Sequence, residues 1–164
     1  MRLLIVDDHE VVRRGVRALL AEKINCDVCG EAVDGQDAIE KARELKPDIV
    51  VMDVSMPRLN GLETTRLIRS TLPDVEVLIL SQHEAPEMAR QALKAGARGY
   101  VVKSSIAKDL VSAVSRVSSG EYFFDPAILD QNPSGHIDVQ EILQRSAAFE
   151  KALRDSEQLY RSTF

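Results

Sequence analysis

The feature that most restricts the fold of this 164-residue sequence is a regular alternation of short apolar runs with longer amphipathic stretches. The apolar runs are continuous rather than alternating in polarity, as in strands covered on both faces, and lie at residues 3–6, 26–32, 48–53, 75–81 and 99–103. The stretches between them repeat apolar residues at spacings of three and four, as helices with one buried side do, at residues 10–22, 35–46, 61–72, 86–96 and 107–120. Five consecutive β–α units predict a parallel sheet with helices on both faces, joined by right-handed crossovers.

The number of units selects among folds of this kind. Five units fit the flavodoxin-like strand order 2-1-3-4-5 better than the larger six-stranded order. Gly96 and Gly120 stand where helix C-caps are expected, and Pro47 and Pro73 stop the helices before them. We therefore expect an α/β domain with a doubly wound, five-stranded parallel sheet over residues 1–122.

The chain changes character after residue 124. Residues 123–137 include two prolines and one glycine, which predicts a linker. Residues 138–164 begin with Asp138 and Glu141 at the spacing of a capping box and contain no later helix breaker, so we expect a C-terminal extension helix. Its apolar stripe is typical of a coiled-coil seam or of a face packed on the domain. We favour the seam, and with it a homodimer, because the linker separates this helix from the core.

Charge and hydropathy exclude several classes of protein. The net charge of -5 gives no general attraction to nucleic acid or to anionic lipid. No apolar run approaches the roughly 20 residues of a membrane span, and the N-terminus reaches acidic residues too early for a signal peptide. We expect a cytoplasmic chain. Cys26 and Cys29 form a C-x-x-C, which can mark a redox or metal pair, but on a strand the two thiols would lie on opposite faces, which favours packing.

Polar side chains follow the expected strands at the point where each strand ends. They are Asp7 and Asp8 after the first strand, Asp53 after the third, Ser81 after the fourth and Lys103 after the fifth. Ligands of doubly wound sheets bind at this edge. Three carboxylates brought together repel one another unless a cation lies among them, and oxygen ligands suit Mg²⁺. A lysine and a hydroxyl opposite these acids are suited to phosphoryl oxygens.

Each of these polar residues has a simpler explanation when taken singly. The acid pair could cap the helix that follows it, Ser81 could be a turn residue, and Lys103 could be a solvated strand end. Asp53 is the hardest to explain in this way, because a carboxylate at the end of a buried strand is costly unless it is paired or used, and no helix begins directly after it. The group as a whole favours phosphoryl chemistry on a carboxylate.

Four segments carry a specific resemblance, namely LLIVDDHEVVRRGVRALL, DGQDAIEKARELKPDIVVMDVSMPRLNGLE, VLILSQHE and ALKAGARGYVVK. Over about residues 1–122 the chain resembles the receiver domain of two-component response regulators, and within these the NarL/FixJ subgroup. The resemblance implies that Asp53 is the phosphoacceptor, which attacks a phosphohistidine of a partner kinase or phosphotransfer protein. It also implies that Asp8, Asp53 and the backbone carbonyl of Ser55 bind Mg²⁺ directly, with Asp7 acting through a metal-bound water.

The resemblance assigns roles to further positions. Lys103 would pair with the phosphoryl group, and the Ser81 hydroxyl would move toward it, which lets Tyr100 turn inward and changes the partner contacts of residues 85–119. Ser55 and His83 would flank the site and tune access of the hydrolytic water. We interpret His9 as a helix-cap residue rather than a ligand, and His136 supports no assignment.

Several alternatives in function remain open. Residues 124–164 are too short, and not basic enough, for the DNA-binding domain of a full NarL/FixJ regulator. The ending ALRDSEQLYRSTF instead resembles the signalling helix that leads into a PAS domain, in which case the chain is the front of a longer multidomain protein. A haloacid-dehalogenase-type phosphatase would need an acid at the position of Ser55. A degenerate receiver would serve only as a dimerisation or docking module. We expect a phosphoacceptor signalling domain that assists its own phosphorylation and dephosphorylation but is not otherwise an enzyme.

Overall fold

Strands and helices alternate along the chain in the computed structural model, which describes residues 1–23 and 25–124. The strands are β1 (Arg2–Val6), β2 (Asp27–Ala32), β3 (Ile49–Asp53), β4 (Glu76–Ser81), β5 (Gly99–Val102) and β6 (Phe123–Phe124). The helices are α1 (Glu10–Lys23), α2 (Gly35–Leu45), α3 (Gly61–Thr71), α4 (Pro86–Lys94) and α5 (Ile106–Ser118), with the 3-10 turn η1 (Lys103–Ser105) before α5. The linker was predicted over residues 123–137; residues 123–124 instead form β6, and residues 125–137 lie outside the described residues, as does the predicted coiled-coil helix over 138–164.

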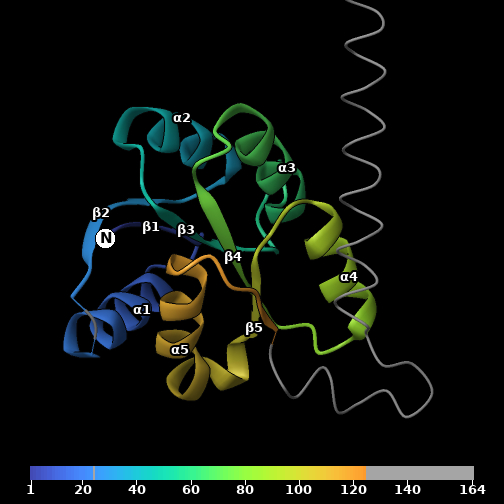
Figure 1. The fold of residues 1–164 in the computed structure, drawn as a ribbon. Helices are drawn as coiled ribbons and strands as arrows, with labels where there is room; N and C mark the ends of the chain where they lie inside the picture. Colours follow the sequence, from blue (N-terminus) through green and yellow to red (C-terminus); the bar gives the residue numbers. More distant parts are fainter. Residues whose placement is uncertain (24, 125–164) are drawn as a thin grey trace, which may run out of the picture.

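The sheet is parallel throughout, with the strand order β2-β1-β3-β4-β5-β6 (Figure 1). The predicted flavodoxin-like class and the order of the first five strands are confirmed. The sixth strand was not predicted. Residues 123–124 pair with Gly99 and Tyr100 at the edge of the sheet, and a two-residue strand leaves no apolar run that a sequence pattern can detect.

The helices cover the two faces of the sheet unequally: α1 and α5 lie on one face, and α2, α3 and α4 on the other (Figure 1). Successive strand residues alternate between two cores, because side chains of a strand point to opposite faces in turn. In β3, Val50 and Met52 pack toward α2, α3 and α4, whereas Ile49 and Val51 pack toward α1 and α5. The predicted continuous apolar strands therefore supply both cores at once.

The expected helix ends are also observed. Gly96 follows α4 with φ 102° and Gly120 follows α5 with φ 88°, a left-handed conformation that favours glycine. Cys26 and Cys29 are free thiols, and Cys26 packs against the core beneath α1 and α5. Within residues 1–23 and 25–124, none of the helices combines the length and the apolarity that crossing a bilayer would require.

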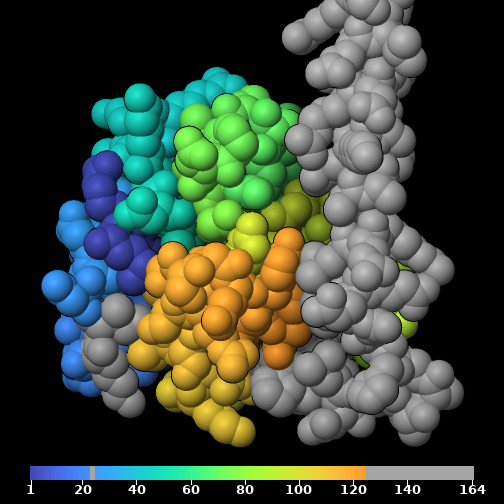
Figure 2. All heavy atoms as spheres, in the orientation of Figure 1, coloured from blue at the N-terminus to red at the C-terminus, as the bar shows by residue number. Residues whose placement is uncertain are grey.

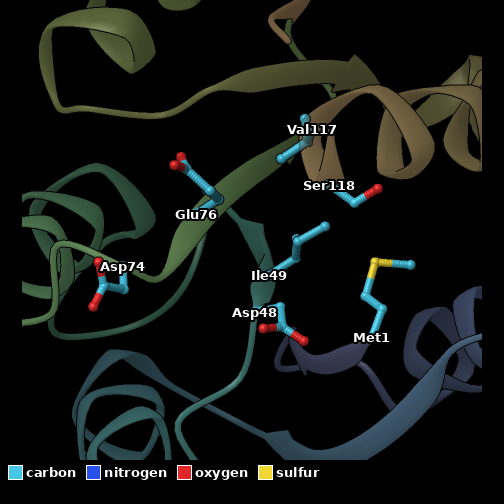
Figure 3. Close-up of a pocket in the computed structure, with 7 residues that line it drawn as sticks. All are labelled: Met1, Asp48, Ile49, Asp74, Glu76, Val117 and Ser118. Carbon is cyan, nitrogen blue, oxygen red and sulfur yellow. The ribbon is translucent and has the colours of Figure 1, made fainter. Parts of the chain in front are cut away.

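A pocket lies at the edge of the sheet formed by the amino ends of the strands, opposite the edge formed by their carboxyl ends. There the first residues of the chain (dark blue) lie beside the end of α5 (orange) in the space-filling view (Figure 2). The pocket of about 320 Å³ opens between them, shown in Figure 3, with the lining residues Met1, Asp48, Ile49, Asp74, Glu76, Val117 and Ser118. None of these seven is a predicted site residue, so the pocket is separate from the group of polar strand ends.

Candidate functional site

Asp53 occupies an enclosed position among the polar strand ends. It is the last residue of β3, which is flanked by β1 and β4, and its side chain is only 2% exposed. Asp7, which directly follows β1, is equally buried. Single carboxylate or imidazole ligand atoms of Asp7, Asp8, His9 and Asp53 all lie within 4.8 Å of one another. The structure thus brings the three predicted acids together.

Lys103, the first residue of η1 directly after β5, completes this cluster. Its Nζ lies 3.0 Å from Oδ1 of Asp53 and 3.3 Å from Oδ2 of Asp7. Burial alone would lower the pKa of the Lys103 ammonium, but the hydrogen bond and charge of Asp53, together with Asp7, outweigh it and raise this pKa. The lysine therefore stays charged and is the counterion of both buried acids.

One oxygen of Asp53 remains without a partner. Oδ2 is buried, and no described group forms a hydrogen bond with it. Burial raises the pKa of the Asp53 carboxyl, which the Lys103 hydrogen bond opposes and the Asp7 charge reinforces. A buried carboxylate oxygen beside two further acids is a suitable ligand for a hard divalent cation. The donor set therefore fits Mg²⁺.

The backbone after Asp53 is held close to the strand. The amide of Ser55 points toward Oδ1 of Asp53 at 3.4 Å, and the amide of Gly61 donates to the carbonyl of Val54 at 2.9 Å. A Cβ on Gly61 would lie 2.1 Å from the carbonyl oxygen of Asp53, so glycine is required for this approach. Asn60 caps α3 by accepting from the amide of Glu63. Ser55 itself is exposed at the edge of the cluster.

Ser81 and Tyr100 both form hydrogen bonds with the backbone of one residue, His83. Ser81, buried at the end of β4, accepts a hydrogen bond on Oγ from the backbone amide of His83 at 3.0 Å. The Tyr100 hydroxyl donates to the carbonyl of the same His83 at 2.7 Å, and the tyrosine is fully buried. Tyr100 thus occupies the inward position that the resemblance links to phosphorylation.

His9 lies closer to the acids than the helix-cap interpretation suggests. Its carbonyl accepts from the amide of Arg13 at the start of α1, as a cap residue does. Its ring Nδ1, however, lies 3.0 Å from Oδ1 of Asp8 and 3.2 Å from Oδ1 of Asp7. The side chain is 63% exposed, so the ring covers the acid pair from the solvent side. Its position directly after two acids was the only sequence signal for this contact.

Comparison with known proteins gives a consistent result. The family model of the response regulator receiver domain matches residues 3–115. The response regulator protein VraR of Staphylococcus aureus is 40% identical over 129 residues, which are 79% of this chain and 62% of VraR. The chain therefore spans less than two thirds of the length of this curated relative.

Solved structures resemble the chain over most of its length. A two-component response regulator of the LuxR family from Aurantimonas sp. SI85-9A1 is 37% identical with a TM-score of 0.75, covering 89% of this chain and 97% of that one. The signal receiver domain of the putative response regulator NarL from Mycobacterium tuberculosis is 34% identical with a TM-score of 0.70, covering 73% and 97%. The isolated receiver domain of RcsB from Salmonella enterica serovar Typhimurium, with phosphomimetic BeF3-, is 25% identical with a TM-score of 0.73, covering 78% and 95%.

Proposed function

The chain belongs to the response regulator receiver family of two-component signalling, and from this membership we propose that Asp53 accepts a phosphoryl group from a histidine kinase in the presence of Mg²⁺. The observation that carries the proposal is the state of the Asp53 side chain. It is buried, it contacts Lys103, and it keeps one oxygen without a partner next to Asp7 and Asp8. Most buried carboxylate oxygens have a hydrogen-bond partner, so an open oxygen next to two further acids favours a ligand-binding role for Asp53.

The proposed transfer forms an acyl phosphate. An oxygen of the Asp53 carboxylate attacks the phosphorus of a phosphohistidine, the phosphorus–nitrogen bond breaks, and the departing imidazole takes up a proton. Asp8, Asp53 and the carbonyl of Ser55 would hold Mg²⁺ directly, with Asp7 acting through water. The metal would neutralise charge on the phosphoryl oxygens.

Lys103 and Ser81 would act on the transferred group. The ammonium now shared between Asp53 and Asp7 can reach an oxygen attached to Asp53, because it already lies 3.0 Å from that side chain. Movement of the Ser81 hydroxyl toward the phosphoryl group would take an acceptor away from the His83 amide, which it now serves. The signal would then pass through the loop after β4 to α4, and through Tyr100 to β5.

Incubation of the full chain with Mg²⁺ and acetyl phosphate tests this function. We expect the protein to gain the mass of one phosphoryl group, and to gain none when Mg²⁺ is chelated. A chain that takes up no phosphoryl group and binds no beryllium fluoride would instead be a degenerate receiver acting as a docking module. Continuous release of phosphate from assorted monoesters would indicate a phosphatase.

The His83 side chain offers a test of phosphoryl lifetime. Its backbone is fixed by Ser81 and Tyr100, while its imidazole is exposed beside the site. His83→Ala keeps both backbone hydrogen bonds but removes a side chain that shields the acyl phosphate from water. We expect dephosphorylation a few-fold faster than in the wild type, measured by loss of the phosphoryl mass over time. Gln82→Ala, at the exposed neighbouring position, is the control, and equal rates for all three proteins would remove this role.

The output of the signal is proposed from sequence alone. RcsB has been solved as two dimers bound to two parallel DNAs. We propose a different arrangement for this chain, in which residues 138–164 form a dimeric signalling helix leading to a downstream domain. Those residues lie beyond the part of the chain that the structure describes.

A further inference from the structure

Arg13 lies one turn into α1, and its side chain turns back toward the end of β1. Its Nη1 donates to the backbone carbonyl of Asp7 at 2.8 Å. Its Nε donates to Oε1 of Glu31, on β2, at 3.2 Å. Only 14% of the side chain is exposed. Arg13 therefore joins three elements at the point where the acid pair begins.

The carbonyl that Arg13 holds belongs to the peptide bond between Asp7 and Asp8. Rotation of this peptide unit would swing the two carboxylates relative to each other. Asp7 is buried and also contacts Lys103, whereas Asp8 is 29% exposed and contacts the exposed ring of His9. The direction of the Asp8 carboxylate therefore depends strongly on the backbone that carries it.

We propose that Arg13 is a positioning residue that sets the Asp7–Asp8 backbone for binding of the divalent cation. The inference rests on the metal site of the proposed function and assigns Arg13 no contact with the metal. A planar guanidinium can serve two acceptors in fixed directions at once, and here it serves a carbonyl on one side and a carboxylate on the other. Loss of a group that orients a metal ligand typically weakens metal binding by about 10- to 100-fold.

A purely structural role of Arg13 would give a different pattern of Mg²⁺ affinities among the variants. In that case Arg13 would stabilise the chain only by tying α1 to β2 through Glu31. Arg17 is the matched control for this possibility. It lies on the same helix and binds the other oxygen of the same Glu31 at 3.0 Å. Arg14 is a second control, because it forms an exposed ion pair with Glu10 on the same helix.

The experiment is a Mg²⁺ titration of the full chain without any phosphodonor. Binding is monitored through the amide chemical shifts of residues in the acid cluster. We expect Arg13→Met to weaken Mg²⁺ binding by about 10- to 100-fold, and Arg17→Met and Arg14→Met to stay within about twofold of the wild type. Arg13→Lys keeps the charge but cannot serve both acceptors, so it should also bind Mg²⁺ more weakly. Raising the Mg²⁺ concentration should restore phosphoryl uptake by Arg13→Met.

Thermal unfolding without Mg²⁺ checks that each variant folds, and if Arg13→Met does not fold, Arg13→Lys decides alone. Wild-type Mg²⁺ affinity in the folded Arg13 variants, or an equal loss of Mg²⁺ affinity in Arg17→Met, would overturn the proposal.

Failure of this inference differs from failure of the proposed function. If the wild type takes up a phosphoryl group while Arg13 variants bind Mg²⁺ normally, only the role of Arg13 is wrong. If Mg²⁺ binding depends on Arg13 but the wild type takes up no phosphoryl group, only the function is wrong.

Discussion

Replacing Asp53 by Asn is expected to abolish phosphoryl uptake from acetyl phosphate. An amide oxygen is a poor nucleophile, and the substitution also removes a negative charge from the metal site. The measurement is the intact mass of the protein after incubation with Mg²⁺ and the phosphodonor. Asp74→Asn is the matched control, because Asp74 is an exposed acid at the opposite edge of the sheet. It should gain the same mass as the wild type.

The same substitution should change how stability depends on pH. Because burial raises the pKa of Asp53, the folded chain keeps this proton to a higher pH than the unfolded chain, whose carboxyl has the ordinary value of 3.8. The contribution of Asp53 to stability is therefore greatest below that value and declines as the pH rises through the raised pKa. Asp53→Asn lacks this decline. In urea unfolding without Mg²⁺, its free energy of unfolding relative to the wild type should increase from acidic to neutral pH.

Two results would contradict these expectations. Full phosphoryl uptake by Asp53→Asn would place the acceptor elsewhere in the chain. A difference in unfolding free energy that does not change with pH would mean that burial costs the Asp53 carboxylate little once Lys103 is beside it. The two measurements are independent, since one concerns reactivity and the other concerns the unliganded fold.

Replacing Gly61 by Ala is expected to destabilise the fold by about 1–3 kcal/mol. The added Cβ would lie 2.1 Å from the carbonyl oxygen of Asp53 and 2.8 Å from Cα of Val54. Both are backbone atoms, which cannot move aside as the end of a flexible side chain can. Either α3 or the end of β3 must shift, so phosphoryl uptake should fall together with the free energy of unfolding, measured in urea.

Gly15→Ala is the matched control for this substitution. Gly15 lies within α1, and a Cβ there would meet no atom within 4 Å. Alanine is favoured over glycine in a helix interior by up to about 1 kcal/mol. We therefore expect opposite signs from the same chemical change, with Gly15→Ala more stable than the wild type. Equal stability of Gly61→Ala and the wild type would show that the contact at Asp53 can relax at no cost.

The sequence predicted those parts of the molecule that follow from periodicity and topology. Continuous apolar runs identified the first five strands. Because all parallel strands end at the same edge, the strand-end residues Asp53, Ser81 and Lys103 could be grouped before any coordinates were known. The edge strand at residues 123–124 could not be predicted, since pairing with Gly99 and Tyr100 rather than its own pattern defines it.

The contacts that could not be predicted from the sequence are those that depend on the direction of a side chain. His9 and Arg13 appear in the sequence as a cap residue and one of several helix arginines. Their contacts with the acid pair depend on rotamers, which packing and neighbouring charges select. The inward position of Tyr100 likewise depends on the loop that brings the carbonyl of His83 within reach of its hydroxyl. Residue types and spacing carry no information of this kind.

The contacts of Lys103 with both buried acids also bear on whether the chain needs a metal ion in order to fold. The Lys103 ammonium balances part of the charge of Asp53 and Asp7 from within the fold, so we do not expect folding to require a cation from solution. Small metalloproteins in which the ion completes the core unfold when it is withdrawn. Under the proposed function, we expect scarcity of Mg²⁺ to leave a folded chain that takes up no phosphoryl group and regains this uptake without refolding when the ion returns.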